Sequence, residues 1–160
     1  MRFLFVFILA TMSLSAQAPD AFTEACVSGK VKEVEAAVAA LPPEKWTEGT
    51  KDCLETAALN GHVELARLLL KLGTPVGGFD GWTPLHVAAI YSYPDCIVVA
   101  ELLIKAGANV NAVTLVERNG IKAGLTPTGV AHASRVKFQA TFGVRNYENM
   151  IEFLKNRGGK

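Results

Sequence analysis

The sequence predicts an all-α fold in which about four helix-turn-helix repeats stack into a solenoid, with β-turn or hairpin fingers and degenerate capping repeats at both ends. Three observations predict this fold class. Phe22, Leu54 and Leu85 open related segments at spacings of 32 and 31 residues. Each clear copy joins a helix rich in small residues to a helix rich in leucine, and a glycine-containing linker follows. A period of roughly 20–50 residues indicates stacking, because one such unit cannot bury its apolar face alone.

The length of 160 residues limits the chain to one ordinary domain, because such a chain buries one sizeable core. Apolar residues make up 50% and charged residues 19%, which supplies a core and argues against disorder throughout the chain. The net charge of +1 excludes a strongly basic binder of nucleic acid or of anionic membranes, whose sites need an excess of lysine and arginine. We therefore expect no nucleic-acid partner.

Residues 1–18 have the layout of a secretory signal peptide. Arg2 is their only charge, an apolar run follows over residues 3–10, and small residues end the segment. The run is shorter than the ~20 residues that span a bilayer, so we expect no stable membrane insertion after cleavage. Cleavage is expected after Ala18 or, because Pro19 fits poorly directly after a cut, after Ser15 or Ala16. The alternative to a signal peptide is that this segment forms a short buried helix at the N-terminus. The leader predicts a periplasmic protein whose domain covers residues 19–160.

The first two repeats are expected at approximately residues 19–49 and 50–80. The first is a weak copy, as expected for an end of the stack that faces water. The second carries small residues for close helix approach, an inter-helix turn, a leucine pair for the buried face and a glycine suited to the left-handed helix end. In order, these are Ala57-Ala58, Asn60-Gly61-His62, Leu68-Leu69 and Gly73.

The last two repeats are expected at approximately residues 81–123 and 124–160. In the third, Thr83 is placed to cap a helix and Pro84 suits its first position, where no N–H is needed. Small residues, a leucine pair and a terminal glycine then recur, at Ala88-Ala89, Leu102-Leu103 and Gly107. The fourth opens with Gly124-Leu125-Thr126-Pro127 and is degenerate, like the first.

Three segments of the sequence together resemble the ankyrin repeat. They are Thr83-Pro84-Leu85-His86-Val87-Ala88-Ala89, Gly61-His62-Val63-Glu64-Leu65 and Gly107-Ala108-Asn109-Val110-Asn111-Ala112. The resemblance covers most of the chain behind the leader. It implies a concave protein-binding face that is built from the fingers and the inner helices. It also implies that His86 is a structural hydrogen-bonding group and not a catalytic base.

Insertions into the pattern are expected to lie on the surface, where function concentrates. Residues 90–96 predict an inter-helix turn that is three residues longer than in the second repeat, with Tyr91 and Tyr93 projecting from it. Thirteen residues separate Ala112 from Thr126, and Asn119-Gly120 within them predicts a β-hairpin finger. In the fourth repeat, about 11 extra residues, roughly 134–147, are expected to leave the regular stack. We interpret them as a capping extension, although their mixed basic and aromatic residues also fit nucleic acid.

Large rigid side chains on a concave face are good interface anchors, because they bury much area at little entropic cost. Phe79 and Trp82 flank a finger tip, and Trp46 lies in the connection after the first repeat. For each tryptophan, folding back over the stack is an equally weighted alternative. The complete set of protein-binding candidates is Trp46, Phe79, Trp82, Tyr91, Tyr93, Leu115, Val116 and Arg118.

Residues with the spacing of a catalytic, metal or cofactor motif are absent from the sequence, so we expect no enzyme, no metal and no cofactor. Cys26, Cys53 and Cys96 lack the C-x-x-C spacing of zinc or redox sites. In the expected repeat register no two of them come obviously within the ~5.5–6 Å Cα spacing of a disulfide. We therefore expect three unpaired cysteines.

The chain is further similar to small periplasmic ankyrin self-protection proteins of predatory bacteria. That similarity implies an inhibitor or immunity protein that sterically blocks a peptidoglycan hydrolase, a D,D-endopeptidase of the penicillin-binding-protein type, and that is monomeric when free. The alternatives are a periplasmic scaffold for a stress-protection enzyme and an exported effector that binds a host protein. Charge separates along the domain, from −5 over residues 19–112 to +5 over residues 113–160, and this polarity could orient a partner.

Overall fold

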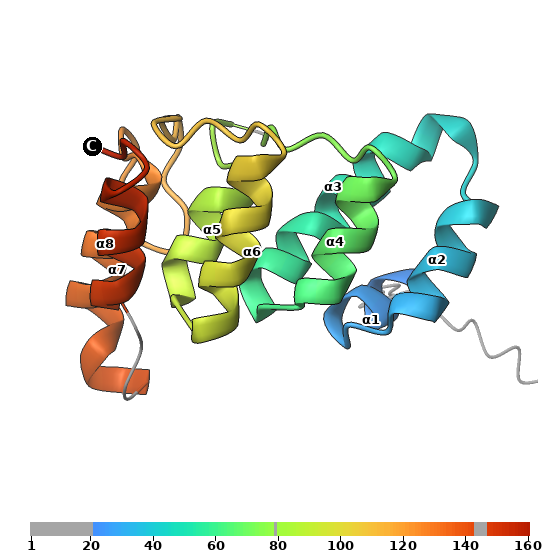
Figure 1. The fold of residues 1–160 in the computed structure, drawn as a ribbon, viewed down its shortest axis with the longest axis horizontal. Coiled ribbons are helices and arrows are strands. Elements are labelled where there is room, and N and C mark those ends of the chain that lie inside the picture. Colours follow the sequence, from blue (N-terminus) through green and yellow to red (C-terminus); the bar gives the residue numbers. More distant parts are fainter. Residues whose placement is uncertain (1–20, 79, 143–146) are drawn as a thin grey trace, which may run out of the picture.

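The computed structural model of the protein describes residues 21–78, 80–142 and 147–160, and within these ranges it contains four helix pairs (Figure 1). The pairs are α1 (Ala21–Val27) with α2 (Val31–Ala40), α3 (Pro43–Asn60) with α4 (Val63–Lys71), α5 (Pro84–Tyr91) with α6 (Pro94–Lys105), and α7 (Pro127–Phe142) with α8 (Tyr147–Lys155). The predicted all-α stack of four repeats is thereby confirmed. The predicted signal peptide lies outside the described residues.

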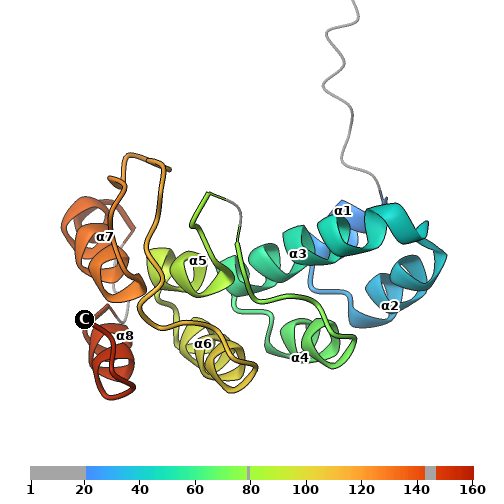
Figure 2. The same cartoon turned by 90° about the horizontal axis from the view of Figure 1, so that it is seen from above.

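Two rows of helices form the stack (Figure 2). The first helices of the pairs, α1, α3, α5 and α7, make one row, and the second helices make the other. Two linkers reach out on the side of the first helices: the α4–α5 finger, residues 72–83, and the α6–α7 finger, residues 106–126. We call this side the first-helix face. It is the face on which the sequence predicts binding.

Small residues allow the first helices to pack closely, as predicted. Ala57, Ala58, Ala88 and Ala89 are completely buried, and α5 packs against both α3 and α7. Leu69 and Leu103 are also completely buried, whereas their neighbours Leu68 and Leu102 are partly buried against the same core.

Among the described residues, no helix is both long and apolar enough to cross a membrane.

The turn between α5 and α6 corrects one prediction, because it contains two residues and is not lengthened. Ser92 adopts a left-handed conformation at φ 50° where the preceding repeat has Gly61 at φ 71°. The Ser92 hydroxyl donates to the carbonyl of Ala89 at 2.9 Å. The three extra residues of this repeat instead lengthen its second helix, since α6 has 12 residues and α4 has 9.

Helices α3 and α7 are longer than the sequence patterns indicated, which corrects two further predictions. Trp46 lies inside α3, and not in a connection, because α3 already begins at Pro43 and proline is tolerated at a first helical position. The insertion near residue 134 does not leave the stack at once: α7 continues to Phe142, whereas α5 has only 8 residues. Residues 143–146 lie outside the described ranges.

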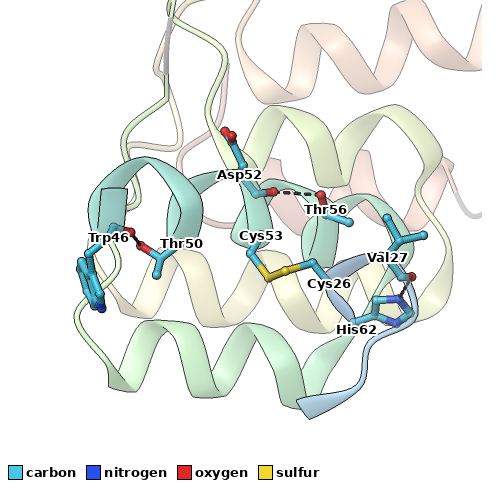
Figure 3. The surroundings of a disulfide bond; sticks show 8 residues. All are labelled: Cys26, Val27, Trp46, Thr50, Asp52, Cys53, Thr56 and His62. Atoms are coloured by element: carbon cyan, nitrogen blue, oxygen red, sulfur yellow. Dashed lines mark hydrogen bonds between the residues drawn. A yellow bond between two sulfur atoms is a disulfide. The ribbon is translucent and has the colours of Figure 1, made fainter. Parts of the chain in front are cut away.

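The prediction of three unpaired cysteines was wrong. Cys26 of α1 and Cys53 of α3 form a disulfide with their Cα atoms 5.3 Å apart (Figure 3). Because α3 begins ten residues before Cys53, this residue lies in the middle of a helix that packs beside α1, and not at a helix start. Cys96 is a buried free thiol. The bond covalently joins the degenerate first repeat to the second.

The hairpin predicted at Asn119-Gly120 is confirmed. Arg118 and Ile121 form an antiparallel bridge, with N–H to carbonyl distances of 3.1 and 2.9 Å in the two directions. Asn119 and Gly120 between them have φ angles of 53° and 67°. Two consecutive positive φ values are those of a type I′ turn, whose twist suits a two-residue hairpin. This hairpin is the outer part of the α6–α7 finger.

Candidate functional site

His86 anchors the base of the α6–α7 finger to α5. Its Nδ1 accepts from the backbone N–H of Thr83 at 3.2 Å, while the Thr83 hydroxyl accepts from the His86 N–H, which completes a capping box. Its Nε2 lies 3.0 Å from the carbonyl of Ala112 and 3.2 Å from that of Leu125. Carbonyls only accept, so Nε2 carries the proton. Burial lowers the pKa of His86 to about 4, which keeps the ring neutral at pH 7. His86 is therefore structural, as the resemblance implied.

Trp82 holds the outer part of the same finger. The indole is completely buried, and its Nε1 donates to the carbonyl of Val116 at 2.8 Å. The Arg118 guanidinium lies over the indole, 5.4 Å from the ring centroid. For Trp82 the alternative expectation of a side chain that folds back over the stack is the one observed. Trp82 supports the binding face from below and offers no surface to a partner.

The α6–α7 finger also bends across α5 to reach the preceding repeat. Arg118 Nη1 donates to Glu55 Oε2 of α3 at 3.2 Å, across 63 residues of sequence. On the opposite side, Lys137 of α7 donates its Nζ to the carbonyl of Asn119 at 2.5 Å. The hairpin is thus attached to the helices on both sides of α5. This fixes its position over the first-helix face.

Apolar side chains point outward from the α6–α7 finger. Leu115 has 72% of its surface exposed, and Val113 and Val116 have 45% and 41%. Leu115 also links the two fingers, because its N–H donates to the carbonyl of Asp80 at 2.9 Å. Neighbouring exposed apolar residues on one well-anchored loop gain free energy when another surface covers them. This edge is the most apolar exposed feature of the described fingers.

Two hollows lie on either side of the Asp52–Thr56 turn of α3. The first, of about 310 Å³, lies between α1 and α3 and reaches the Cys26–Cys53 disulfide. The second, of about 280 Å³, lies between α3, α5 and the α6–α7 hairpin. Asp52 and Thr56 line both, so the two hollows are neighbours along α3. We call the two together the α3 groove.

Carboxylates dominate the polar wall of the α3 groove. Glu48, Asp52 and Glu55 follow one another at spacings of four and three residues, which places them on one side of α3. Burial raises the pKa of Glu55 despite its pairing with Arg118, and burial with nearby Glu48 raises the pKa of Asp52. Lys45 lines the first hollow. The groove therefore combines partly desolvated carboxylates with fewer cations.

A short series of aromatic rings continues the face beyond the groove. Tyr91 stacks on Tyr93, with ring centroids 6.4 Å apart, and on Phe138 of the extended α7 at the same distance. Tyr93 is 42% exposed, while Tyr91 is partly buried against the core. The ammonium of Lys137 lies 5.4 Å from the Phe138 centroid. The long α7 thus adds an aromatic and basic edge to the last repeat.

The predicted binding residues therefore fall into separate groups. Leu115, Val116 and Arg118 come together on the α6–α7 finger, and Tyr91 and Tyr93 lie together at the end of α5. Trp46 is partly buried against the core from α3, Trp82 is completely buried, and Phe79 lies outside the described residues. Sequence reasoning missed the carboxylates of α3, Asp52 and Glu55. It noted Lys137 and Phe138 among the basic and aromatic residues of the fourth repeat but did not include them in the binding face. The spacing of Glu48, Asp52 and Glu55 was the available signal.

Within the described ranges, no group of three or more histidine, cysteine, aspartate or glutamate residues is arranged to hold a metal ion.

A family model described as ankyrin repeats (3 copies) matches residues 22–114. Protein phosphatase 1 regulatory subunit 27 of Homo sapiens and of Mus musculus are each 43% identical over 61 residues, 37% of this chain. Ankyrin repeat and KH domain-containing protein mask-1 of Caenorhabditis elegans is 34% identical over 83 residues, 46% of this chain. The chain spans 38% of the subunit's length and 3% of mask-1.

Proposed function

Because the chain belongs to the ankyrin-repeat family, we propose that it is an exported binding protein that covers and blocks a peptidoglycan hydrolase. Ankyrin-repeat proteins are typically non-catalytic modules with protein partners. The observation that carries a binding role here is the anchored α6–α7 finger, which exposes Leu115, Val113 and Val116 and whose Arg118 and Asn119 line part of the α3 groove. Rigid apolar residues next to a groove suit an interface, since little conformational freedom is lost on binding.

Two features support export to the periplasm. The first 18 residues have the composition of a signal peptide. The Cys26–Cys53 disulfide suits an oxidising compartment, because cytosolic thiols are kept reduced. The proposed location is therefore the periplasm, where peptidoglycan hydrolases act.

The proposed mechanism is steric. The finger and the first-helix face cover the hydrolase cleft, and no chemistry of the binding protein is needed. A regulatory role toward an enzyme has a parallel in the relatives named as a regulatory subunit of protein phosphatase 1. The proposed target is a D,D-endopeptidase of the penicillin-binding-protein type, in keeping with the resemblance to self-protection proteins.

Co-purification from the periplasm followed by an inhibition assay tests this function. We expect the chain to retain a wall hydrolase and to inhibit it at a near-equal molar ratio. Leu115→Glu is expected to abolish inhibition, because a charge would have to be buried in the interface. Val98→Glu, at a valine on α6 that is 40% exposed, is the control and is expected to inhibit normally. Full hydrolase activity in excess binding protein would refute the inhibitor role, and raised activity of a bound enzyme would favour a scaffold.

A further inference from the structure

We infer that the part of the α3 groove between α3, α5 and the finger receives an arginine or lysine side chain of the partner, with an apolar residue of the partner beside it. This inference rests on the proposed protein-binding function and adds the chemistry of what is bound. It follows from the size of the hollow, from the composition of its floor and walls, and from the guanidinium that the chain itself places at its edge.

The size of the hollow suits a side chain better than a metabolite. Its volume of about 280 Å³ is just below the roughly 300–1,000 Å³ of most small-molecule sites. Leu59, Val87 and Ile90 provide apolar lining from α3 and α5. Such a floor packs against the methylene groups of a long basic side chain, whose charged end then reaches the wall.

Two carboxylates line the wall of the hollow, and they differ in whether a described residue of the chain forms an ion pair with them. Glu55 is paired with Arg118, and its side chain is only 18% exposed. Asp52, one helical turn earlier, forms no ion pair with any residue that the structure describes, although Lys51 and Arg118 lie near enough to lower its pKa. Partial burial and Glu48 nevertheless raise the pKa of Asp52. An additional cation would pair with Asp52 and offset the repulsion from Glu48, and this attraction would favour the charged carboxylate despite its partial burial.

Arg118 shows that a guanidinium fits this environment. It combines an ion pair to Glu55 with a position over the Trp82 ring, a combination typical of arginine at interfaces. Its side chain remains 37% exposed, so it lies at the edge of the hollow and does not fill it. A basic side chain of the partner therefore enters beside Arg118 and competes with it for Glu55. An acidic side chain would meet Asp52 and Glu55 and would be repelled.

Selection from a random peptide library displayed on phage, with the purified chain as bait, tests this inference. We expect the selected peptides to be enriched in arginine or lysine next to an apolar residue. For one synthetic peptide from the selection, Asp52→Asn with Glu55→Gln is expected to weaken binding about tenfold or more, as for a lost charge-assisted contact. Asp52→Asn alone leaves the Arg118–Glu55 ion pair that attaches the hairpin in place, and it is still expected to weaken binding severalfold.

Glu64→Gln is the matched control, since Glu64 is an exposed carboxylate on α4 and pairs with Arg67. It is expected to change the affinity by less than about twofold. Circular dichroism and thermal unfolding of each variant establish that the fold is retained. Selected peptides without basic residues, or an affinity that is indifferent to the Asp52 and Glu55 changes, would overturn the inference. Co-purification of the chain with a partner would still stand in that case, so that failure here and failure of the proposed function are distinguishable.

Discussion

His86 links α5 to both ends of the α6–α7 finger, because one ring nitrogen belongs to the capping box and the other donates toward Ala112 and Leu125. This arrangement requires the neutral ring. Burial lowers the pKa of His86 to about 4, whereas a histidine in the unfolded chain titrates near 6.5. The unfolded state therefore binds a proton before the folded state does. The associated stability is complete above about pH 6.5 and is lost as the pH falls toward 4.

The loss expected from His86 between pH 6.5 and 4 is about 3 kcal/mol in the free energy of unfolding. Urea unfolding at several pH values measures it. In His86→Gln, which cannot titrate, this part of the pH dependence should vanish. The pKa values of Asp52 and Glu55 are raised, so these two groups increase the free energy of unfolding as the pH falls. They do so in both proteins, and the difference between wild type and variant therefore isolates His86. Equal slopes for the two proteins would contradict the assigned role.

Trp82 supports the finger from inside, and Trp82→Phe should therefore act on stability. The variant loses the hydrogen bond from Nε1 to the Val116 carbonyl and part of the buried ring volume. We expect the free energy of unfolding to fall by about 1–3 kcal/mol, with faster amide exchange in the finger. Trp46→Phe serves as a comparison and should cost less, because Trp46 is only partly buried. A Trp82 variant of unchanged stability would place this residue at the surface instead.

At the scale of elements, the α4–α5 finger depends on a close approach of backbone to backbone at Gly78. A Cβ atom there would lie 1.2 Å from the carbonyl oxygen of Trp82, so Gly78→Ala must displace the finger. We expect it to cost about 2 kcal/mol or more in thermal or urea unfolding. Gly77→Ala is the matched control, because a Cβ at Gly77 meets nothing within 4 Å. Equal stability of the two variants would show that the finger does not hold this conformation.

The disulfide between α1 and α3 is the covalent part of the first repeat. It closes a loop with a sequence separation of 27 residues, which corresponds to about 3.5 kcal/mol of stability in the chain-entropy model. Reduction should lower the free energy of unfolding by roughly that amount and should increase amide exchange first in α1 and α2. Cys96→Ala, compared with and without reductant, should show the same difference. No effect of reductant on the midpoint would argue against the bond.

How far the sequence predicted these elements depended on how each one begins and ends. The third repeat was predictable, because Thr83 and Pro84 mark a helix start and Asn119-Gly120 marks a hairpin. The start of α3 was not, since Pro42-Pro43 reads equally as a linker, and that misplacement concealed the approach of Cys53 to Cys26. The α5–α6 turn was misjudged because Ser92 holds the left-handed position usually given to glycine.

At the scale of the whole molecule, the first-helix face changes character along the stack. The carboxylates of α3 line one part, apolar residues of α5 follow, and Lys137 with Phe138 on α7 provide a basic and aromatic end. The sequence predicted that the net charge changes from −5 over residues 19–112 to +5 over residues 113–160. It did not predict which charged side chains lie on the first-helix face. Those depend on helix rotation and on the length of α7, which no local motif specifies.

We propose that a protein partner covers the first-helix face and its finger. The most direct measurement is site-specific photo-crosslinking in the producing cell, with a photoreactive residue at Leu115 or, as the control, at Val98 of α6. Both side chains are exposed. We expect a hydrolase adduct from position 115 and none from position 98. An adduct of that hydrolase from position 98 alone, or no adduct from position 115, would contradict it.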